Sequence, residues 1–366
     1  MSCPFPLLLG PLRRRPKSAM KSCLRQRTKR PLLMDLSILI VNWNTCQYLR
    51  SCLAAIRSSV RGVAFEVIVV DNASRDGSAD MVRSEFPEVR LVASPENLGF
   101  ARGNNLAFSL SSGRTVLVMN PDVEILEGTA EELVSFAEQH PEAGALSPKL
   151  VHPDGTIQNY YGRIPSLSTI FFVYTIPGSW VDRRLLGSRI RRRDRFEFGD
   201  FQDVLWFTDG GAAFSCTLIP RAVIEKIGFM DERFPVFFND GDFGIRLFRA
   251  GYKACILPNV KAVHHGGGSV RQLDELAYNQ EFIYGLRAFY RAHTGWLYRR
   301  AIDLALFCNL PARFAKTLGH VLLGRAPADR LVRLFPDFWK TFNYRPRNAR
   351  NHLYKVPHPD GPARRA

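Results

Sequence analysis

One apolar run of the chain ends in a carboxylate that could bind a metal ion. The residues from Val116 to Met119 have the length of a buried strand, and they stop at Asn120-Pro121-Asp122. Pro121 has no N–H and cannot continue a sheet ladder, so we expect the strand to end there. Asp122 would then lie beyond a carboxyl edge, where open α/β sheets bind ligands and where a divalent cation could bridge a diphosphate. An ordinary strand followed by a polar turn explains this stretch alone equally well.

The same kind of polar ending recurs along the chain. The four endings are Asn42-Trp43-Asn44, Asp71-Asn72-Ala73-Ser74, the stretch 97–105 and Asn120-Pro121-Asp122. Each alone is typical turn chemistry, but at successive strands of one parallel sheet they would converge on one crevice. No G-x-G-x-x-G follows the first strand and no G-K-[ST] occurs, so the sequence lacks the dinucleotide and P-loop signatures.

A second group of acids and histidines follows in the C-terminal half. Asp240 and Asp242 flank a glycine where a helix is expected to begin. They could cap that helix and favour its dipole, or one of them could act as a general base toward a hydroxyl. His264 and His265 precede a Gly-rich turn; adjacent side chains point in different directions, so at most one should reach a shared metal.

Strands and helices alternate from Met34 onward, which predicts an α/β fold. Continuous Val/Ile/Leu strands indicate a mainly parallel sheet covered by helices on both faces. The expected strands are 36–41, 65–70, 89–93, 115–119, 213–219, 255–257 and 261–263. The expected helices are 45–58, 76–86, 101–111, 131–138, 220–227, 241–250 (stopped by Gly251), 275–293, 296–323 and 330–342.

Composition bounds the class of protein. With 46% hydrophobic and 11% aromatic residues, the chain of 366 residues can build a proper core. Seven scattered cysteines without a C-x-x-C pair favour reduced thiols in a cytoplasmic setting over disulfides or a zinc site. Residues 1–33 read as a disordered basic extension, and Met34 is an alternative start.

The net charge of +16 lies on the two flanks. Residues 1–34 hold nine Lys/Arg and no acid, and residues 271–366 hold 17 Lys/Arg against seven Asp/Glu. No nucleic-acid-binding motif is evident, so we expect peripheral contact with an anionic membrane and no nucleic acid. The helical region 271–366 is expected to lie on the membrane as amphipathic helices, or to pack on the core. Residues 150–203, with a basic run from Arg183 to Arg195, read as an irregular insertion or acceptor loop.

Taken in order, six motifs resemble the family 2 glycosyltransferases of GT-A fold, in the bacterial rhamnosyltransferase-like branch. They are VNWN, DNAS, ENLGFARGNN, MNPDV, FFNDGDFGIRLFRAGY and VHHGGGS, which together span about residues 35–270. The resemblance implies a GT-A domain over 34–270 (a Rossmann-like, mainly parallel sheet flanked by helices) with a C-terminal helical extension. It also implies an inverting enzyme that uses Mg²⁺ or Mn²⁺ to move a sugar, rhamnose from dTDP-rhamnose, onto a lipid-linked or polysaccharide acceptor.

The resemblance also assigns roles to single residues. Donor-nucleotide contacts fall on Asn44, Asp71, Asn97, Asn104 and Asp122, metal ligation on Asp122 and His264, catalytic base function on Asp240, and acceptor or leaving-group contacts on Gly210, Gly211, Asp242 and Arg246.

Two positions depart from the family pattern. Asn120 replaces the first acid of Asp-x-Asp, and Asn239 replaces the Glu of Glu-Asp-x-Asp. Three alternatives therefore stay open: a UDP- or GDP-sugar donor, a catalytically silent sugar-nucleotide-binding scaffold, and a nucleotidyltransferase. The last lacks a Gly-rich, basic loop after the first strand.

Overall fold

A computed structural model describes residues 34–158, 166–172, 175–190, 200–210, 214–268 and 270–344. The predictions for the N-terminal extension 1–33, for the loose C-terminal end and for most of the Arg-rich run lie outside these residues.

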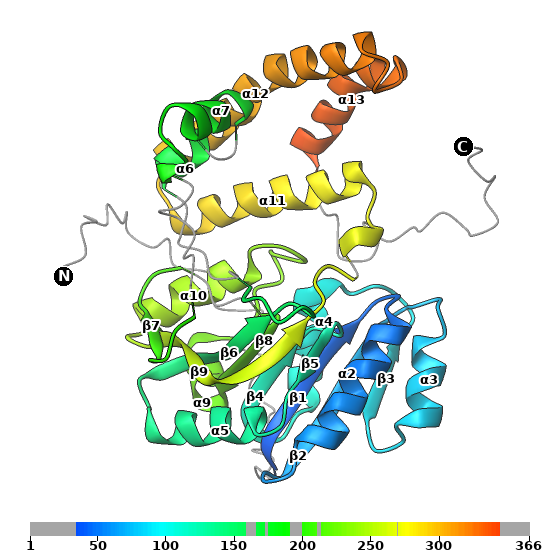
Figure 1. The fold of residues 1–366 in the computed structure, drawn as a ribbon, viewed down its shortest axis with the longest axis vertical. Helices are drawn as coiled ribbons and strands as arrows, with labels where there is room; N and C mark the ends of the chain where they lie inside the picture. The colour runs from blue at the N-terminus through cyan, green and yellow to red at the C-terminus, as the bar shows by residue number, and fades with distance from the viewer. Residues whose placement is uncertain are drawn as a thin grey trace, which may run out of the picture.

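A nine-stranded mixed sheet forms the centre of the lower half of the molecule in Figure 1. Its order is β3-β2-β1-β4-β8-β6-β9-β5, and β7 also pairs with β9. The strands are β1 Met34–Asn42, β2 Phe65–Asn72, β3 Arg90–Ser94, β4 Gly113–Met119, β5 Val123–Ile125, β6 Ala143–Val151, β7 Leu205–Phe207, β8 Cys216–Pro220 and β9 Lys253–His264. The first four strands are parallel, as predicted, whereas β8 is antiparallel to β4 and β6.

Helices cover both faces of this sheet. The helices are α2 Cys46–Ser59, α3 Ser78–Glu85, α4 Gly99–Leu110, α5 Thr129–Gln139, α9 Arg221–Ile227 and α10 Asn239–Arg249. Leu36, Ile38 and Ile40 of β1 pack against α2, α3 and α5, whereas Leu39 and Val41 face α4, α9 and α10. This alternation along β1 buries both faces and explains why the strand is apolar throughout.

A helical layer lies above the sheet domain (Figure 1). It consists of α11 Glu275–His293, α12 Trp296–Leu322 and α13 Asp329–Asn343, together with α6 Leu167–Phe172 and α7 Ile176–Arg184, which pack on α12. Phe289 and Tyr290 of α11 join Phe234 and Ile245 of the sheet domain in one buried cluster. The layer is therefore anchored through α11. No helix within the described ranges is both long and apolar enough to cross a bilayer.

Three elements differ from the sequence prediction. Residues 150–203 are not irregular throughout, because α6 and α7 form there and pack on α12. Strand β6 was not predicted; its sequence contains Gly144 and Pro148, which mask a run that is buried at every position. The two short strands expected at 255–263 are one strand, β9, which continues through Pro258.

Candidate active site

The first two strand endings form a turn that is hydrogen-bonded internally. The amide of buried Asn42 donates to Asp71 Oδ1 (2.9 Å), and Asp71 Oδ2 accepts from the Ser74 N–H (3.0 Å). Asn44, in the left-handed region with φ 50°, accepts from the Arg75 N–H through its side-chain oxygen (2.8 Å). These contacts use Asp71 and Asn44 to join the ends of β1 and β2, so both residues help to shape the edge of the sheet.

The loop after β3 leaves polar atoms unpaired. Asn97 Oδ1 accepts from the Gly99 N–H (2.8 Å), and Asn104 Nδ2 donates to the Phe100 carbonyl (3.0 Å). Asn97 Nδ2 and Asn104 Oδ1 are buried and have no hydrogen-bond partner among the described residues. Buried donors and acceptors are almost always paired, so one free donor and one free acceptor mark a place where a ligand would satisfy both.

Asp122 meets His264 where β5 pairs with β9. Asp122 is 5% exposed, and its Oδ1 lies 3.5 Å from His264 Nε2. Burial raises the pKa of Asp122, but His264 and the Gly268 N–H outweigh it and keep the pKa below its ordinary value. Asp122 is thus an ionised, largely desolvated carboxylate at neutral pH.

Gln158, which the sequence analysis missed, orients His264. Its Oε1 lies 2.8 Å from His264 Nδ1, so Nδ1 carries the proton and donates to that oxygen. The Nε2 lone pair then faces the Asp122 carboxylate, and Nε2 is buried without a hydrogen-bond partner in the described part of the chain. Two facing lone pairs repel unless a cation lies between them, so the pair fits a divalent metal ion. Gln158 lies in the stretch read as irregular, and no motif marks it.

The remaining ligands of such a metal are not supplied by a larger protein cluster. Among the residues that the structure describes, no three His, Cys, Asp or Glu side chains gather as a metal site. His265 turns away and pairs with Glu124 (3.0 Å). A cation held by Asp122 and His264 would therefore keep open coordination positions for oxygen atoms of a ligand.

Asp240 lies in the first turn of α10 and keeps much of its acceptor capacity. The one hydrogen bond to its side chain in the described ranges comes from the Gly241 N–H (2.8 Å). Burial raises the pKa of this carboxyl above its ordinary value. The preceding Phe238 has φ 68°, a left-handed conformation held by ring contacts with Phe282 and Phe289 of α11. The departure from the family pattern, Asn239, donates to the Val236 carbonyl (2.8 Å) in the same turn.

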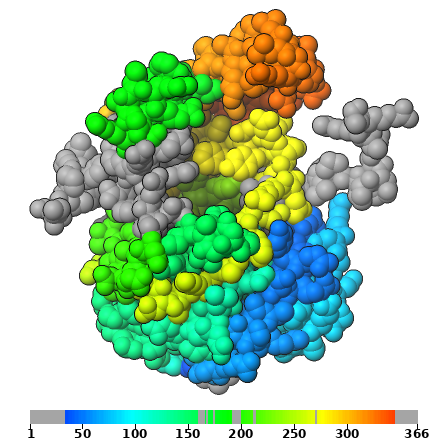
Figure 2. All heavy atoms as spheres, in the orientation of Figure 1, coloured from blue at the N-terminus to red at the C-terminus, as the bar shows by residue number. Residues whose placement is uncertain are grey.

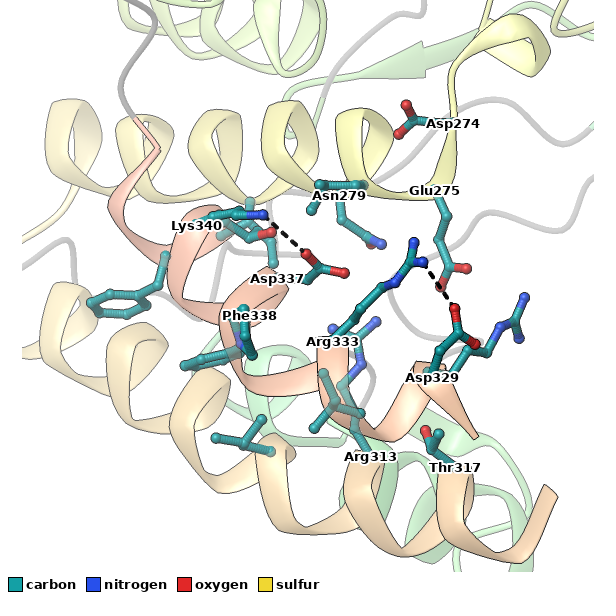
Figure 3. Close-up of a pocket in the computed structure, with 18 of the residues that line it drawn as sticks. Asp274, Glu275, Asn279, Arg313, Thr317, Asp329, Arg333, Asp337, Phe338 and Lys340 are labelled. Atoms are coloured by element: carbon teal, nitrogen blue, oxygen red, sulfur yellow. Dashed lines mark ion pairs between the residues drawn. The ribbon is translucent and has the colours of Figure 1, made fainter. Parts of the chain in front are cut away.

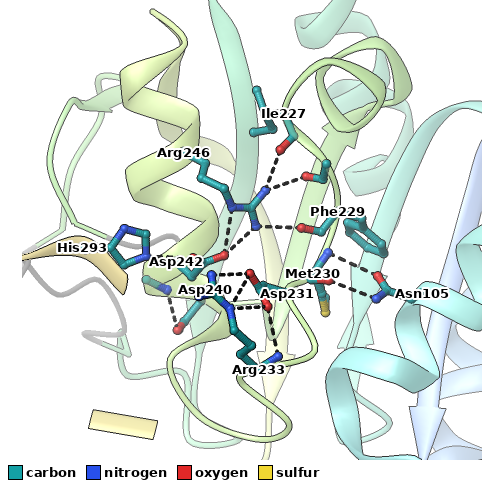
Figure 4. A network of polar contacts seen from close by, with 12 residues as sticks. Asn105, Ile227, Phe229, Met230, Asp231, Arg233, Asp240, Asp242, Arg246 and His293 are labelled. Carbon is teal, nitrogen blue, oxygen red and sulfur yellow. Dashed lines mark hydrogen bonds and ion pairs between the residues drawn. The ribbon is translucent and has the colours of Figure 1, made fainter. Parts of the chain in front are cut away.

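Asp242 and Arg246, by contrast, are fully engaged within the protein (Figure 4). Asp242 Oδ2 accepts from Arg246 Nε (2.9 Å) and also lies 2.7 Å from Nη2, while Oδ1 accepts from His293 Nε2 (2.8 Å). Arg246 also donates to the carbonyls of Ile227, Gly228 and Phe229. The geometry therefore gives these two residues a positioning part rather than a ligand contact. Gly210 is buried with φ 97°, and Gly211 lies outside the described residues.

The donor-side loop and the segment before Asp240 are joined directly. The N–H groups of Phe100 and Ala101, at the start of α4, donate to the Pro235 carbonyl (2.8 and 3.2 Å). Asn105 exchanges two hydrogen bonds with the backbone of Met230. A Cβ on Gly99 would come within 3.0 Å of the Pro235 oxygen, which explains the glycine. One crevice thus has the donor-side asparagines and the candidate base on linked elements.

Comparisons with known proteins agree with this arrangement. The family model described as Glycosyl transferase family 2 matches residues 37–228. The N-acetylglucosaminyl-diphospho-decaprenol L-rhamnosyltransferase of Mycobacterium tuberculosis is 28% identical over 243 residues, or 63% of this chain and 76% of that protein. The low-salt glycan biosynthesis hexosyltransferase Agl10 of Haloferax volcanii is 25% identical over 264 residues (67% and 73%). Among solved structures, S. aureus TarS 1–349 aligns at 14% identity with a TM-score of 0.45, covering 84% of this chain and 89% of that one.

The fold and the crevice define a nucleotide-sugar-dependent transferase. The chain belongs to glycosyl transferase family 2, and it is an enzyme of GT-A fold with an added C-terminal helical layer. The prediction of family and fold from the six motifs is confirmed.

Proposed function

We propose that this enzyme is a metal-dependent, inverting rhamnosyltransferase that uses dTDP-rhamnose and a lipid-linked acceptor in cell-envelope glycan synthesis. The observation that carries the proposal is the set of buried, unpaired polar atoms on Asn97, Asn104 and His264. All three residues belong to motifs at the ligand-binding edge of the sheet, and a sugar nucleotide with its cation would satisfy them. The choice of rhamnose and of a lipid acceptor rests on the similarity to the mycobacterial rhamnosyltransferase.

In this proposal Asp122 and His264 hold Mg²⁺ or Mn²⁺, which when bound neutralises charge on the donor diphosphate. Asn97 and Asn104 hydrogen-bond the nucleotide through the atoms left free in the structure, and the Asp71 turn shapes its pocket. These residues fix the donor so that one face of its anomeric carbon is open to the acceptor.

Asp240 is the base. It accepts the proton of the acceptor hydroxyl while that oxygen forms a bond to the anomeric carbon and the bond to the donor phosphate breaks. The burial that raises its pKa makes it a better proton acceptor than an exposed aspartate. Attack from the face opposite the leaving group gives inversion. No covalent enzyme intermediate is required.

The helical layer is proposed to touch the inner face of the cytoplasmic membrane. It exposes many large apolar side chains, among them Trp180, Leu185, Trp296, Leu297, Leu304, Phe314, Leu322, Val332, Phe335 and Trp339. Exposed apolar side chains beside Lys and Arg are the signature of a helix that lies in an anionic interface. Such a location would bring the enzyme to a lipid-linked acceptor.

A thermal-shift panel with dTDP, UDP and GDP, each with and without Mn²⁺, tests donor and metal together. A ligand that binds the native state raises its melting temperature by mass action. We expect a Mn²⁺-dependent shift with dTDP that His264→Ala reduces and that the neighbouring control His265→Ala keeps. A shift with UDP or GDP alone would keep the class and replace the donor. The absence of any shift would favour the silent scaffold, with Asn120 as its cause.

A further inference from the structure

A groove runs between α11 on one side and α12 and α13 on the other. It contains a cavity of about 860 Å³ and an adjoining one of about 450 Å³. The two share six lining residues that matter below: Asn279, Ile283, Leu306, Arg313, Arg330 and Phe338. Figure 2 shows the molecule hollowed below α12, and Figure 3 shows the larger cavity from close by.

The groove has an apolar floor. Ile283 lines both cavities and comes from α11, while Leu306 of α12 and Phe338 of α13 face it. Phe282 and Leu286 extend this surface in the smaller cavity. A soluble domain would normally close such a surface by packing the helices together, so its exposure indicates a ligand with an apolar part.

The groove also carries cations that no carboxylate neutralises. In the larger cavity Arg333 pairs with Asp329 (3.0 Å) and Lys340 lies 3.7 Å from Asp337 (Figure 3). Arg313, Lys316 and Arg330 have no ion pair within the described residues, and all three line the smaller cavity. Glu275 is the one carboxylate among the residues lining that cavity. Apolar floor and excess positive charge together suit an amphipathic anion.

The smaller cavity lies one side-chain layer from the candidate base. Phe282 lines it and packs on Phe238 with ring centroids 5.4 Å apart, and Phe238 stands two residues before Asp240. A Cβ on Gly285 would meet Phe238 Cδ2 at 2.8 Å, so α11 approaches this segment as closely as a glycine allows. A ligand in the groove would therefore lie near the end of the crevice that receives the acceptor.

From these observations we infer that the groove binds an isoprenoid diphosphate, the lipid portion of the acceptor. The isoprenoid lies along Ile283, Leu306 and Phe338, and Arg313, Lys316 and Arg330 bind the diphosphate, which has a negative charge on each phosphate. The inference rests on the proposed function, because it names the chemistry of the acceptor carrier for the same reaction. It assigns the helical layer a specific binding role in addition to general membrane contact.

The test is co-sedimentation of the full chain with phosphatidylcholine vesicles that contain farnesyl diphosphate. Vesicles with phosphatidylglycerol, matched in total charge, measure general attraction to an anionic surface. We expect tighter binding to the farnesyl diphosphate vesicles. The double variant Arg313→Ala/Lys316→Ala should lose roughly tenfold or more of this preference, a typical loss for two charge-assisted contacts.

Two further variants control the test. Arg300→Ala/Arg325→Ala removes two exposed cations of the same layer that do not line the groove, and it should keep the preference. Ile283→Trp keeps every charge and fills the apolar floor, so it should weaken binding to the farnesyl diphosphate vesicles only. Equal binding to both vesicles by the wild type, or equal loss in the two double variants, would overturn the inference in favour of bulk lipid contact.

The nucleotide panel separates this inference from the proposed function. If dTDP with Mn²⁺ still raises the melting temperature of the wild type and of all variants, the proteins are folded and the donor site is intact. Failure of vesicle preference then refutes the groove alone. A missing nucleotide shift in the wild type counts against the proposed function, whatever the vesicles show.

Discussion

The donor edge and the base helix treat their polar side chains in opposite ways. At the donor edge Asn97, Asn104 and His264 each keep one buried polar atom unpaired. Around α10 the Asp242 carboxylate has both oxygens paired, and Arg246 binds Asp242 and three backbone carbonyls. Since an unpaired buried group costs about 1–3 kcal/mol, the first region keeps binding capacity for a ligand and the second uses its capacity for stability.

Asp240 is the exception on α10, and its replacement should have the largest effect. Asp240→Asn removes the proton acceptor and should lower transfer by roughly 10²–10⁴-fold. Nucleotide binding with Mn²⁺ should stay, because Asp240 does not lie at the donor edge. Initial rates together with nucleotide thermal shifts measure the two effects. Asp231→Asn, which replaces a carboxylate paired with Arg233 in the same segment, is the matched control; full transfer by Asp240→Asn would refute the base assignment.

Asp242→Asn tests the saturated side of the comparison. It leaves the partly buried Arg246 guanidinium without its counter-charge and should lower the free energy of unfolding by about 3 kcal/mol. Chemical denaturation at neutral pH measures this loss. Asp80→Asn breaks a solvent-exposed pair with Arg83 and should cost less than about 0.5 kcal/mol. A loss as small for Asp242 as for Asp80 would mean that the network of Figure 4 adds no stability.

Glu281 of α11 breaks the pattern, because it is buried outside the candidate site and still has an unpaired oxygen. Burial raises its pKa to about 7, although the Tyr344 hydroxyl, which donates to its other oxygen, acts in the opposite direction. The folded state therefore holds a proton that the unfolded state releases near its ordinary pKa of 4.5.

The contribution of Glu281 to stability is thus largest below about pH 4.5 and is lost as pH rises through about 7. The shift corresponds to about 3 kcal/mol in total. Glu281→Gln should flatten this part of the stability profile, measured as free energy of unfolding against pH. Parallel profiles for wild type and variant would show that Glu281 titrates normally in the folded state.

The smallest expected effect comes from two adjacent asparagines. Asn104 keeps a free oxygen, whereas Asn105 satisfies both backbone groups of Met230. Asn104→Ala should weaken nucleotide binding by about 1–2 kcal/mol and change stability little, and Asn105→Ala should do the reverse. Calorimetric titration and thermal melting separate the two. The same ratio of effects in both variants would remove the distinction between the two regions.

The N-terminal half of the fold could be predicted from the sequence because its strands are buried on both faces. Val, Ile and Leu in 36–41 and 65–70 leave little alternative to a parallel sheet, and β1, β2 and β4 are paired in that way. Strand β6 and helices α6 and α7 could not be predicted, because their burial depends on β9 and α12, which lie about 100 or more residues further along the chain.

Much of the candidate site could be predicted as residue types but not as contacts. The motifs marked Asp122 and both histidines, yet only the structure pairs His264 with Asp122 and turns His265 to Glu124. The spacing of Asp242 and Arg246 fits both a ligand contact and an ion pair four residues apart. Which of the two applies depends on His293 and on the end of α9, which no local pattern reveals.

The Pro235 carbonyl has a consequence for engineering. It accepts two hydrogen bonds from the start of α4, so the stretch that leads to the base also completes the first turn of the donor-side helix. Donor specificity and acceptor chemistry are therefore not independent modules. A chimera that takes 97–105 from one relative and 229–240 from another would mismatch this joint. Exchanging both stretches together keeps it, and this pair is the smallest transferable unit of the crevice.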